Sequence, residues 1–244
     1  MIQTIIMTSD RPPHPLPGFI RLWQRYNNFP NQVNVVCGFT KPEYDLPDSF
    51  RFVSMGKQED FPPQRWSERL HTVLTDIADD IFILMLDDYW LVRQVDEKAL
   101  KMAYDYMHQF TNVLKIDLTF DRLFAEGGGK YLFGYNTYNT LGHLDLIKSN
   151  PGSAYHMSLW GGMWRRDLLD RFLVPGETAQ QIELSGTSRL AMAGDEVLVL
   201  GTRQAPMRHI NAIQGRVWNR QESGIHGMQQ SDLNDLKATF GYDF

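Results

Sequence analysis

Short apolar runs alternate with amphipathic segments over the first ninety residues, and this alternation limits the possible folds more than any other feature of the chain. Four of the runs fit strands, over 4–9, 32–39, 51–55 and 81–92. Two segments, 19–26 and 65–80, carry apolar residues at helical spacing. The order strand, helix, strand, strand, helix, strand is typical of a mainly parallel sheet covered by helices. The sequence therefore predicts an α/β fold with such a sheet at its centre.

A proline-rich segment joins the first predicted strand to the first predicted helix. The segment "DRPPHPLPG", residues 10–18, has four prolines in nine residues. Because proline fixes φ and removes a hydrogen-bond donor, we expect a fixed loop here.

The second half of the chain gives weaker patterns. We predict a helix over 95–110, a strand over 112–120, an irregular loop or hairpin over 126–143, and a loop that runs into a helix over 158–173. The segments 193–201 and 208–213 fit either strands or short helices. Ser231 can serve as the N-cap of a helix in the C-terminal tail. We find no repeat, low-complexity segment or clean linker, so we expect one domain over 1–244.

Cysteine usage and the shortness of the apolar runs bear on the compartment. The one cysteine, Cys37, lies in an apolar run, which excludes a disulfide framework and favours a reducing compartment. The first residues, "MIQTIIMTSDR", lack the charged region that opens a signal peptide. No window approaches the roughly 18 apolar residues of a membrane span. We therefore predict a cytoplasmic protein without a membrane span, of undetermined oligomeric state.

The charges are unevenly distributed. A net charge of −5 argues against a general polyanion binder. Between residues 149 and 236, however, every basic side chain is an arginine: Arg165, Arg166, Arg171, Arg189, Arg203, Arg208, Arg216 and Arg220. The planar guanidinium suits phosphates and carboxylates better than a lysine does. Two interpretations remain open, namely surface ion pairs and a phosphate-rich ligand that faces the C-terminal half.

Two adjacent carboxylates follow the most apolar predicted strand, in "IFILMLDDYWLV". Asp87 and Asp88 come directly after six apolar residues. Open α/β sheets bind ligands beyond the carboxyl ends of their strands, so this is where a site is expected. Paired carboxylates can hold Mg²⁺ or Mn²⁺, which prefer oxygen ligands. The alternative is a polar strand end with no ligand.

Other polar residues fall at comparable places. At the end of the first predicted strand, "TSDRPP" offers hydroxyls and a carboxylate for a base or ribose and Arg11 for a phosphate; turn chemistry is the alternative. Arg65 and Arg69 lie one turn apart near a helix start, where an anion is favoured. The alternative for them is an ion pair with Glu68 or Asp76.

An aromatic, glycine-containing segment lies further on. In "YHMSLWGGMW" two glycines between tryptophans would let a ligand approach the backbone, and indole faces stack on sugar rings and bases. Glu177 and Glu183 follow in a polar stretch, and either can be a general base or a merely solvated carboxylate. No HxH, HExxH, Gly-x-Ser-x-Gly, Walker or GxGxxG spacing is present, which argues against zinc, hydrolase, NTPase and dinucleotide sites.

Taken together, these motifs resemble the nucleotide-diphospho-sugar glycosyltransferases of the GT-A fold. Within them the chain is similar to a bacterial and viral branch with strand ends of the type "L-x-E-D-Y-W-L", here Leu86 to Leu91. That branch also carries "S-L-Q-P-x-x-W-R-R-D-x-L", "P-G-E-S-P-W-E-F-E" and "N-A-I-x-x-G-K-W", which match parts of 158–169, 175–183 and 211–218. The chain departs from the pattern where Trp160 replaces a frequent glutamine and where Gln180 and Gln181 replace the tryptophan and first acid of "WEFE".

The resemblance implies a single GT-A, Rossmann-like domain and a metal-dependent hexosyltransferase that uses a nucleotide sugar, most naturally a UDP-sugar. The nucleotide-sugar-binding half would be 1–110, the acceptor-binding half 111–220 and the tail 221–244. Asp88, helped by Asp87, would hold Mn²⁺ or Mg²⁺ against the diphosphate, with His209 as a further metal-ligand candidate.

The resemblance also implies roles for other residues. Those expected to bind the nucleotide sugar are Thr8, Ser9, Asp10, Arg11, Arg65, Arg69 and Asp87. Those expected to line the donor-sugar and acceptor pocket are Tyr155, Trp160, Gly161, Trp164 and Glu177. Glu183 would take the proton from the acceptor hydroxyl if the configuration at the sugar is inverted.

The acceptor remains open between two candidates. One is a hydroxymethylated base in DNA, such as 5-hydroxymethylcytosine, as in viral DNA modification. The other is a bacterial surface glycan or its lipid-linked precursor. Two other classes of protein also remain, a non-catalytic nucleotide- or carbohydrate-binding module and a sugar nucleotidyltransferase that would release pyrophosphate.

Overall fold

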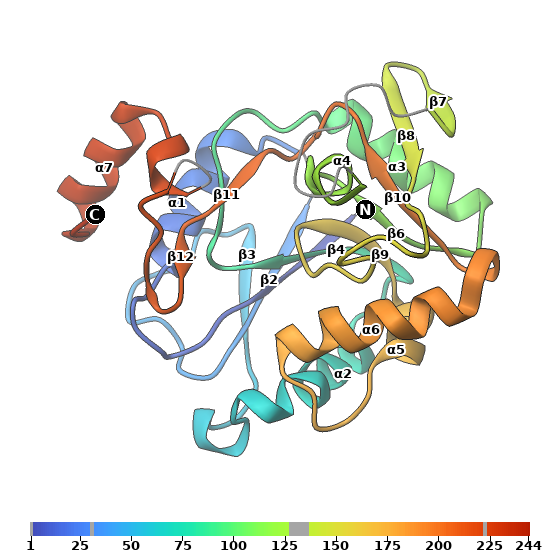
Figure 1. The fold of residues 1–244 in the computed structure, drawn as a ribbon. Helices are drawn as coiled ribbons and strands as arrows, with labels where there is room; N and C mark the ends of the chain where they lie inside the picture. The colour runs from blue at the N-terminus through green and yellow to red at the C-terminus, as the bar shows by residue number, and fades with distance from the viewer. Residues whose placement is uncertain (1, 30–31, 127–136, 222–223) are drawn as a thin grey trace.

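A twisted central sheet with helices on both faces forms the body of the molecule (Figure 1). The computed structural model describes residues 2–29, 32–126, 137–221 and 224–244. In these ranges the sheet has nine strands in the order β3-β2-β1-β4-β9-β6-β10-β8-β7. Their bounds are β1 Gln3–Met7, β2 Val33–Gly38, β3 Phe50–Ser54, β4 Ile81–Leu86, β6 Val113–Asp117, β7 Asn139–Leu141, β8 Leu144–Lys148, β9 Gly162–Arg165 and β10 Leu198–Thr202.

Most strands of this sheet run in the same direction. β1 pairs in parallel with β2 on one side and β4 on the other, with Ile5 opposite both Val35 and Leu84. β10 is parallel to β6, whereas β9 is antiparallel to both of its neighbours. The predicted α/β fold with a mainly parallel, helix-flanked sheet is confirmed.

The sheet separates two apolar layers, because successive residues of a strand point to opposite faces. The helices are α1 Leu16–Tyr26, α2 Trp66–Asp76, α3 Glu97–Gln109, α4 Asp121–Glu126, α5 Arg166–Phe172, α6 Ala179–Ala193 and α7 Gln230–Phe240. α2, α5 and α6 pack on the face that carries Ile5 and Leu84. α1 and α3 pack on the opposite face, which carries Ile6 and Ile83.

The loop predicted over 10–18 is shorter than expected, because α1 begins at Leu16. Pro17 stands in the first turn of the helix. An N–H there has no partner within the helix, so proline costs little at that position.

The run predicted as one strand over 81–92 is two strands. β4 ends at Leu86, and Asp87 and Asp88 form a turn. β5 (Tyr89–Leu91) then pairs antiparallel with β11 (His209–Asn211), outside the central sheet. Both strands are buried, so the apolar pattern did not reveal the break. The two carboxylates therefore lie in a turn between strands.

The segment 158–173, predicted as a loop running into a helix, contains the strand β9 as well as α5. Gly162 brings β9 close to its neighbour, since a Cβ at this position would lie 2.3 Å from Cε of Lys115. The glycines taken as loop formers thus serve in part to pack a strand.

The remaining segments are settled as follows. Residues 193–201 form a 3₁₀ turn, η3 (Gly194–Glu196), and most of β10. Residues 208–213 form β11 and the start of β12 (Ile213–Gln214). β12 pairs with β13 (Val217–Trp218). Of the loop or hairpin predicted over 126–143, residues 127–136 lie outside the described part, and 139–148 form the β7–β8 hairpin. Other 3₁₀ turns are η1 Gln58–Asp60, η2 Pro63–Arg65 and η4 Ile225–Gly227.

The tail helix α7 starts one residue before the predicted cap. Gln229 occupies the N-cap position without a side-chain hydrogen bond, and Ser231 lies inside the first turn. Within the described residues, no helix has the length and apolar character that a bilayer crossing requires.

Candidate functional site

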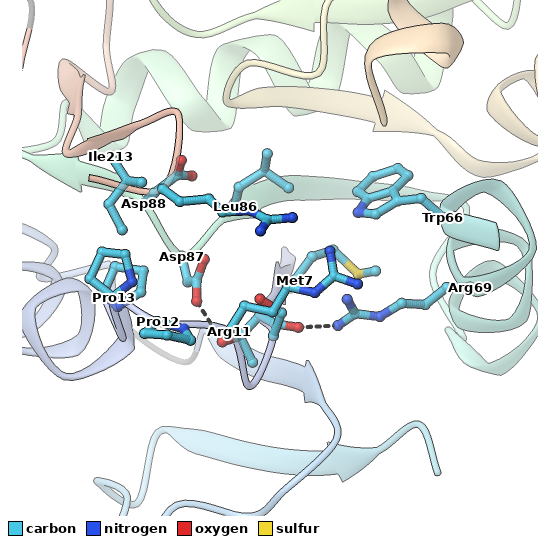
Figure 2. Close-up of a pocket in the computed structure, with 14 residues that line it drawn as sticks. Met7, Arg11, Pro12, Pro13, Trp66, Arg69, Leu86, Asp87, Asp88 and Ile213 are labelled. Carbon is cyan, nitrogen blue, oxygen red and sulfur yellow. Dashed lines mark hydrogen bonds between the residues drawn. The ribbon is translucent and has the colours of Figure 1, made fainter. Parts of the chain in front are cut away.

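A cavity of about 270 Å³ opens where β1 and β4 end (Figure 2). Because these strands are parallel neighbours, the residues that follow them meet at one edge of the sheet. The lining is Met7, Thr8, Ser9, Arg11, Pro12, Pro13, Pro15, Trp66, Arg69, Leu86, Asp87, Asp88, Ile213 and Arg216. The structure thus brings together five of the residues predicted to bind nucleotide sugar and one of the two predicted metal ligands.

Asp87 ties the ends of β1 and β4 together. Its backbone N–H donates to the carbonyl oxygen of Met7 at 3.1 Å, and Thr8 Oγ1 donates to its Oδ2 at 2.5 Å. Burial raises the pKa of Asp87 to about 7. Figure 2 shows this carboxylate directed toward the Arg11 side of the cavity.

Asp88 points the other way, toward Ile213 (Figure 2). Its Oδ1 is buried and has no hydrogen-bond partner among the described residues. Burial, followed by the charge of Asp87, raises the pKa of Asp88 to about 8. A buried carboxylate oxygen without a donor is costly unless a cation or a proton satisfies it. Asp88 therefore fits the predicted role of a metal ligand.

Arg69 shapes the floor of the cavity by binding backbone. Its Nη2 donates to the carbonyl oxygens of Thr8 and Cys37, at 2.5 Å for Cys37, and the guanidinium lies 4.5 Å from the ring centroid of Phe39. Burial lowers the pKa of Arg69 to about 10. This arginine joins the ends of β1 and β2, so it positions the cavity wall rather than reaching out as a free cation.

Of the other predicted nucleotide-binding residues, two lie at the cavity and two are used elsewhere. Ser9 and Arg11 also line an adjoining cavity of about 340 Å³. Asp10 accepts hydrogen bonds from the backbone and hydroxyl of Thr40, at 3.1 and 2.6 Å. Arg65 is exposed, pairs with Glu68 at 3.4 Å and lines neither cavity, as the ion-pair alternative expected.

Trp160 and Gly161 lie in an aromatic group on the β11 side of the acidic turn. The ring centroid of Tyr89 is 5.7 Å from that of Trp160 and 4.9 Å from that of His209. A Cβ on Gly161 would lie 3.0 Å from Cε1 of His209, so glycine is required for the close packing. Burial lowers the pKa of His209 to about 4, which keeps the ring neutral at pH 7.

His209 as a further metal ligand stays a prediction: both of its ring nitrogens are buried and have no hydrogen-bond partner among the described residues. Its ring is enclosed by Tyr89, Trp160 and Gly161. In the described part of the chain, no three His, Cys, Asp or Glu residues are arranged to hold a metal ion. A cation at Asp88 would therefore take most of its ligands from a bound substrate and water.

Three further residues expected in the donor-sugar and acceptor pocket line neither of these two cavities. Trp164 is fully buried in the apolar layer under α5 and α6, because it belongs to a central strand. Glu177 forms a two-pronged ion pair with Arg189, with both contacts at 2.8 Å, which fixes the loop before α6. Tyr155 is 44% exposed, in a turn with φ of 51°.

Glu183 lies on α6, half-buried beneath the loop that carries Trp160. Its Oε1 accepts a hydrogen bond from the backbone N–H of Leu159 at 2.8 Å. Burial raises the pKa of this carboxyl. After burial, the charges of Asp88 and then Glu183 raise the pKa of Tyr89, so both carboxylates act on the same tyrosine from different elements.

Sequence reasoning missed a buried ion pair beside this group. Lys115 Nζ donates to Asp117 Oδ2 at 2.9 Å and to the carbonyl oxygen of Ser158 at 2.8 Å. The sequence did contain a sign of this pair, since Lys115 and Asp117 alternate with apolar residues in the strand β6. The roles of Ile213 and Arg216 in lining the cavity were also missed, although both stand in the C-terminal motif quoted above.

Comparison with known proteins supports the fold. No family model and no curated protein sequence matches the chain. The crystal structure of S. aureus TarS matches with a TM-score of 0.50 and 12% identity, covering 82% of this chain and 35% of TarS. A mannosyltransferase from Pyrobaculum calidifontis, solved with GDP-Man and Mn²⁺, matches with a TM-score of 0.42 and 14% identity over 81% of this chain and 56% of its own. A cytidylyltransferase from Leptospira borgpetersenii gives 0.44 and 12% over 100% and 88%.

This chain spans 35% of the length of TarS, the first of these structures. At 12% identity the likeness to TarS concerns the fold alone. The chain is therefore an α/β, Rossmann-like protein that shares the fold of TarS over most of its own length.

Proposed function

We propose that the chain is a metal-dependent glycosyltransferase that moves a sugar from a UDP-sugar to a hydroxyl acceptor. One observation carries the proposal: Asp88, which lines the cavity at the carboxyl edge of the sheet, has a buried carboxylate oxygen with no hydrogen-bond partner among the described residues. A structural carboxylate would have found a donor, whereas one that meets a cation on a substrate needs none.

The donor set fits a hard divalent cation. Mg²⁺ and Mn²⁺ are commonly held by one or two carboxylates together with substrate phosphates and water. Asp88 would bind the cation directly, and Asp87, whose Oδ2 is held by Thr8, would add negative charge beside it. A cation bound here would neutralise the charge that develops on the departing diphosphate.

The remaining residues of the cavity suit a nucleoside diphosphate. Arg11 is half-buried and has no ion-pair or hydrogen-bond partner among the described residues, so its guanidinium is available to a phosphate. Ser9 lies between the two adjoining cavities and offers a hydroxyl to the ribose or the base. Arg69 holds the strand ends that shape this surface.

Glu183 is the proposed proton acceptor. As the acceptor oxygen bonds to the anomeric carbon, its proton passes to the Glu183 carboxylate and the bond from that carbon to the diphosphate oxygen breaks. Burial raises the pKa of this carboxyl, which strengthens it as a base near neutral pH. The hydrogen bond from Leu159 fixes one oxygen and leaves the other for the acceptor.

A nucleoside-diphosphate release assay tests the proposal. Purified protein would be incubated with UDP-, GDP- and dTDP-sugars and Mn²⁺, with glycan and modified-DNA acceptors in separate arms. We expect UDP release, and a loss of about 10²–10³-fold in kcat for Asp88→Asn. Asp105→Asn, which removes an exposed carboxylate on α3, is the matched control. Release of pyrophosphate, or no release together with no metal-dependent UDP binding, would contradict the proposal.

A further inference from the structure

A groove adjoins the cavity that contains Asp87 and Asp88, and the proposed donor site does not use it. It has a volume of about 770 Å³ and is lined by Pro12, Pro13, Arg216, Val217, Trp218 and Arg220. We call it the Trp218 groove. Pro12, Pro13 and Arg216 line the groove and the cavity alike, so a ligand in one lies next to a ligand in the other.

The groove has a rigid aromatic wall. The half-buried Trp218 ring is backed by Trp90, Tyr242 and Phe244, with centroid distances of 5.4, 4.7 and 5.0 Å. Tyr242 is itself fixed, because its hydroxyl donates to the carbonyl oxygen of His14 at 3.0 Å and accepts from the N–H of Gly18 at 3.2 Å. An indole held in this way is a stacking surface that loses little freedom when a flat ring binds.

Two arginines flank this wall without partners. Arg216 and Arg220 are exposed, and among the described residues neither forms an ion pair or hydrogen bond, in contrast to Arg189 and Arg69. Arg216 has a φ of 67° beside Gly215 at 59°, in the two-residue turn of the β12–β13 hairpin. A residue with a Cβ is unfavourable in this backbone region. The turn nevertheless has an arginine here, and this arginine lines both the cavity and the Trp218 groove.

The lining determines what kind of ligand fits. Its side chains offer hydrogen-bond donors from arginine and tryptophan but no acceptor, since the others are proline and valine. Sugar hydroxyls need both donors and acceptors, whereas phosphate oxygens only accept. A flat ring for the indole and phosphates for the arginines are found together in a nucleotide.

We infer that the Trp218 groove binds a nucleotide unit of a nucleic-acid strand, with its base on Trp218 and its phosphates at Arg216 and Arg220. The inference rests on the proposed function in one respect: the strand would present its hydroxyl to the adjoining cavity and would be the acceptor class of that transfer. The binding itself requires neither donor sugar nor metal.

Fluorescence anisotropy with a labelled single-stranded oligodeoxynucleotide tests the inference, using the full chain without metal or sugar donor. We expect Arg220→Gln to weaken binding about five- to tenfold and to lower the salt slope by about one, as the loss of one phosphate contact does. Val217→Asp, at a position 64% exposed, should weaken binding at least as much, because it adds an anion to the groove. Arg171→Gln removes the same charge from an exposed position on α5, and this variant should bind the oligonucleotide like the wild type.

Two further arms separate this inference from the proposed function. Asp88→Asn should bind the oligonucleotide normally, and saturating UDP with Mn²⁺ should not displace it. The inference is overturned if the two groove variants bind like Arg171→Gln, if UDP competes with the oligonucleotide, or if a neutral oligosaccharide binds in its place with loss in the groove variants. Groove-dependent binding that persists when no donor sugar is turned over would leave the inference standing while the proposed function fails.

Discussion

Asp117 is the last residue of β6, and Asp88 follows the end of β4. The two carboxylates have opposite surroundings. Asp117 is fully buried, yet it accepts hydrogen bonds from Lys115 and from the backbone and hydroxyl of Thr119 at 2.9, 2.9 and 2.7 Å. Burial pushes its pKa upward, but Lys115, Arg122 and Thr119 outweigh that effect and leave the pKa below its usual value. Asp88 has an oxygen with no partner in the part of the chain that the structure describes, and its pKa rises to about 8.

The difference separates an acid whose hydrogen bonds are satisfied by the fold from the one that we propose as a metal ligand. Burial acts on both side chains, so burial alone does not decide their chemistry. The presence or absence of donors does. Asp117 serves the fold through Lys115, which also holds the carbonyl oxygen of Ser158 in the loop before Trp160. Asp88 has no such partner in the described part of the chain, so a proton or a bound cation would have to satisfy it.

Breaking the satisfied pair should have the largest effect. Lys115→Met keeps most of the side-chain volume but leaves the Asp117 carboxylate buried without its cation. We expect the free energy of unfolding to fall by about 3–5 kcal/mol, measured by urea denaturation. The double variant Lys115→Met with Asp117→Asn removes the stranded charge and should recover more than half of the loss. If Lys115→Met costs less than about 1 kcal/mol, the ion pair does not hold this region together.

Arg11 and Arg65 also differ in whether the protein supplies a partner, although the sequence predicted that both bind the nucleotide sugar. Arg11 has no partner among the described residues, whereas Arg65 is already paired with Glu68. A charge-assisted hydrogen bond to a phosphate contributes about 1.5–3 kcal/mol, so Arg11→Gln should weaken UDP binding by tenfold or more in calorimetric titrations with Mn²⁺. Arg65→Gln should change neither UDP affinity nor stability by more than about 0.5 kcal/mol. Equal effects of the two substitutions would refute the assignment.

The fold and the position of the site were accessible from the sequence, because both follow from local patterns. The alternation of strands and helices fixed the sheet, and the sheet placed Thr8 and Asp87 at the same edge. What the pattern lacked was information on partners. Asp87 and Asp88 look equivalent in the sequence, and only the fold shows that Thr8 binds one whereas no described residue binds the buried Oδ1 of the other.

Long-range contacts account for most of the corrections. Trp164 was expected in a pocket because tryptophan beside glycine suits a ligand, but the chain uses that glycine to pack a central strand. Glu177 was expected to face an acceptor, but Arg189, twelve residues later, binds its carboxylate. Neither partner can be recognised from spacing, since each depends on how separate elements meet.

The last prediction concerns how stability depends on pH, and it sharpens the comparison of Asp88 with Asp117. Asp88 and Asp87 have folded-state pKa values of about 8 and about 7, raised above the ordinary value of 3.8. Between pH 4 and pH 8 these two carboxyls therefore bind more protons in the folded chain than in the unfolded chain. Their contribution to the free energy of unfolding should fall as pH rises through this range, by up to about 1.4 kcal/mol per pH unit for each fully coupled proton.

Asp88→Asn removes one of these two titrating carboxyls. We expect the variant to show a flatter dependence on pH from 5 to 8 and to be more stable than the wild type at pH 8 without metal, because an unpartnered charge has been removed. In the wild type, Mn²⁺ competes with protons for Asp88, so its affinity should rise with pH up to about 8 and should restore the lost stability. Unfolding curves that are the same for both proteins at every pH, with no response to Mn²⁺, would mean that the Asp88 carboxylate is already satisfied within the protein. It would then belong with Asp117 after all.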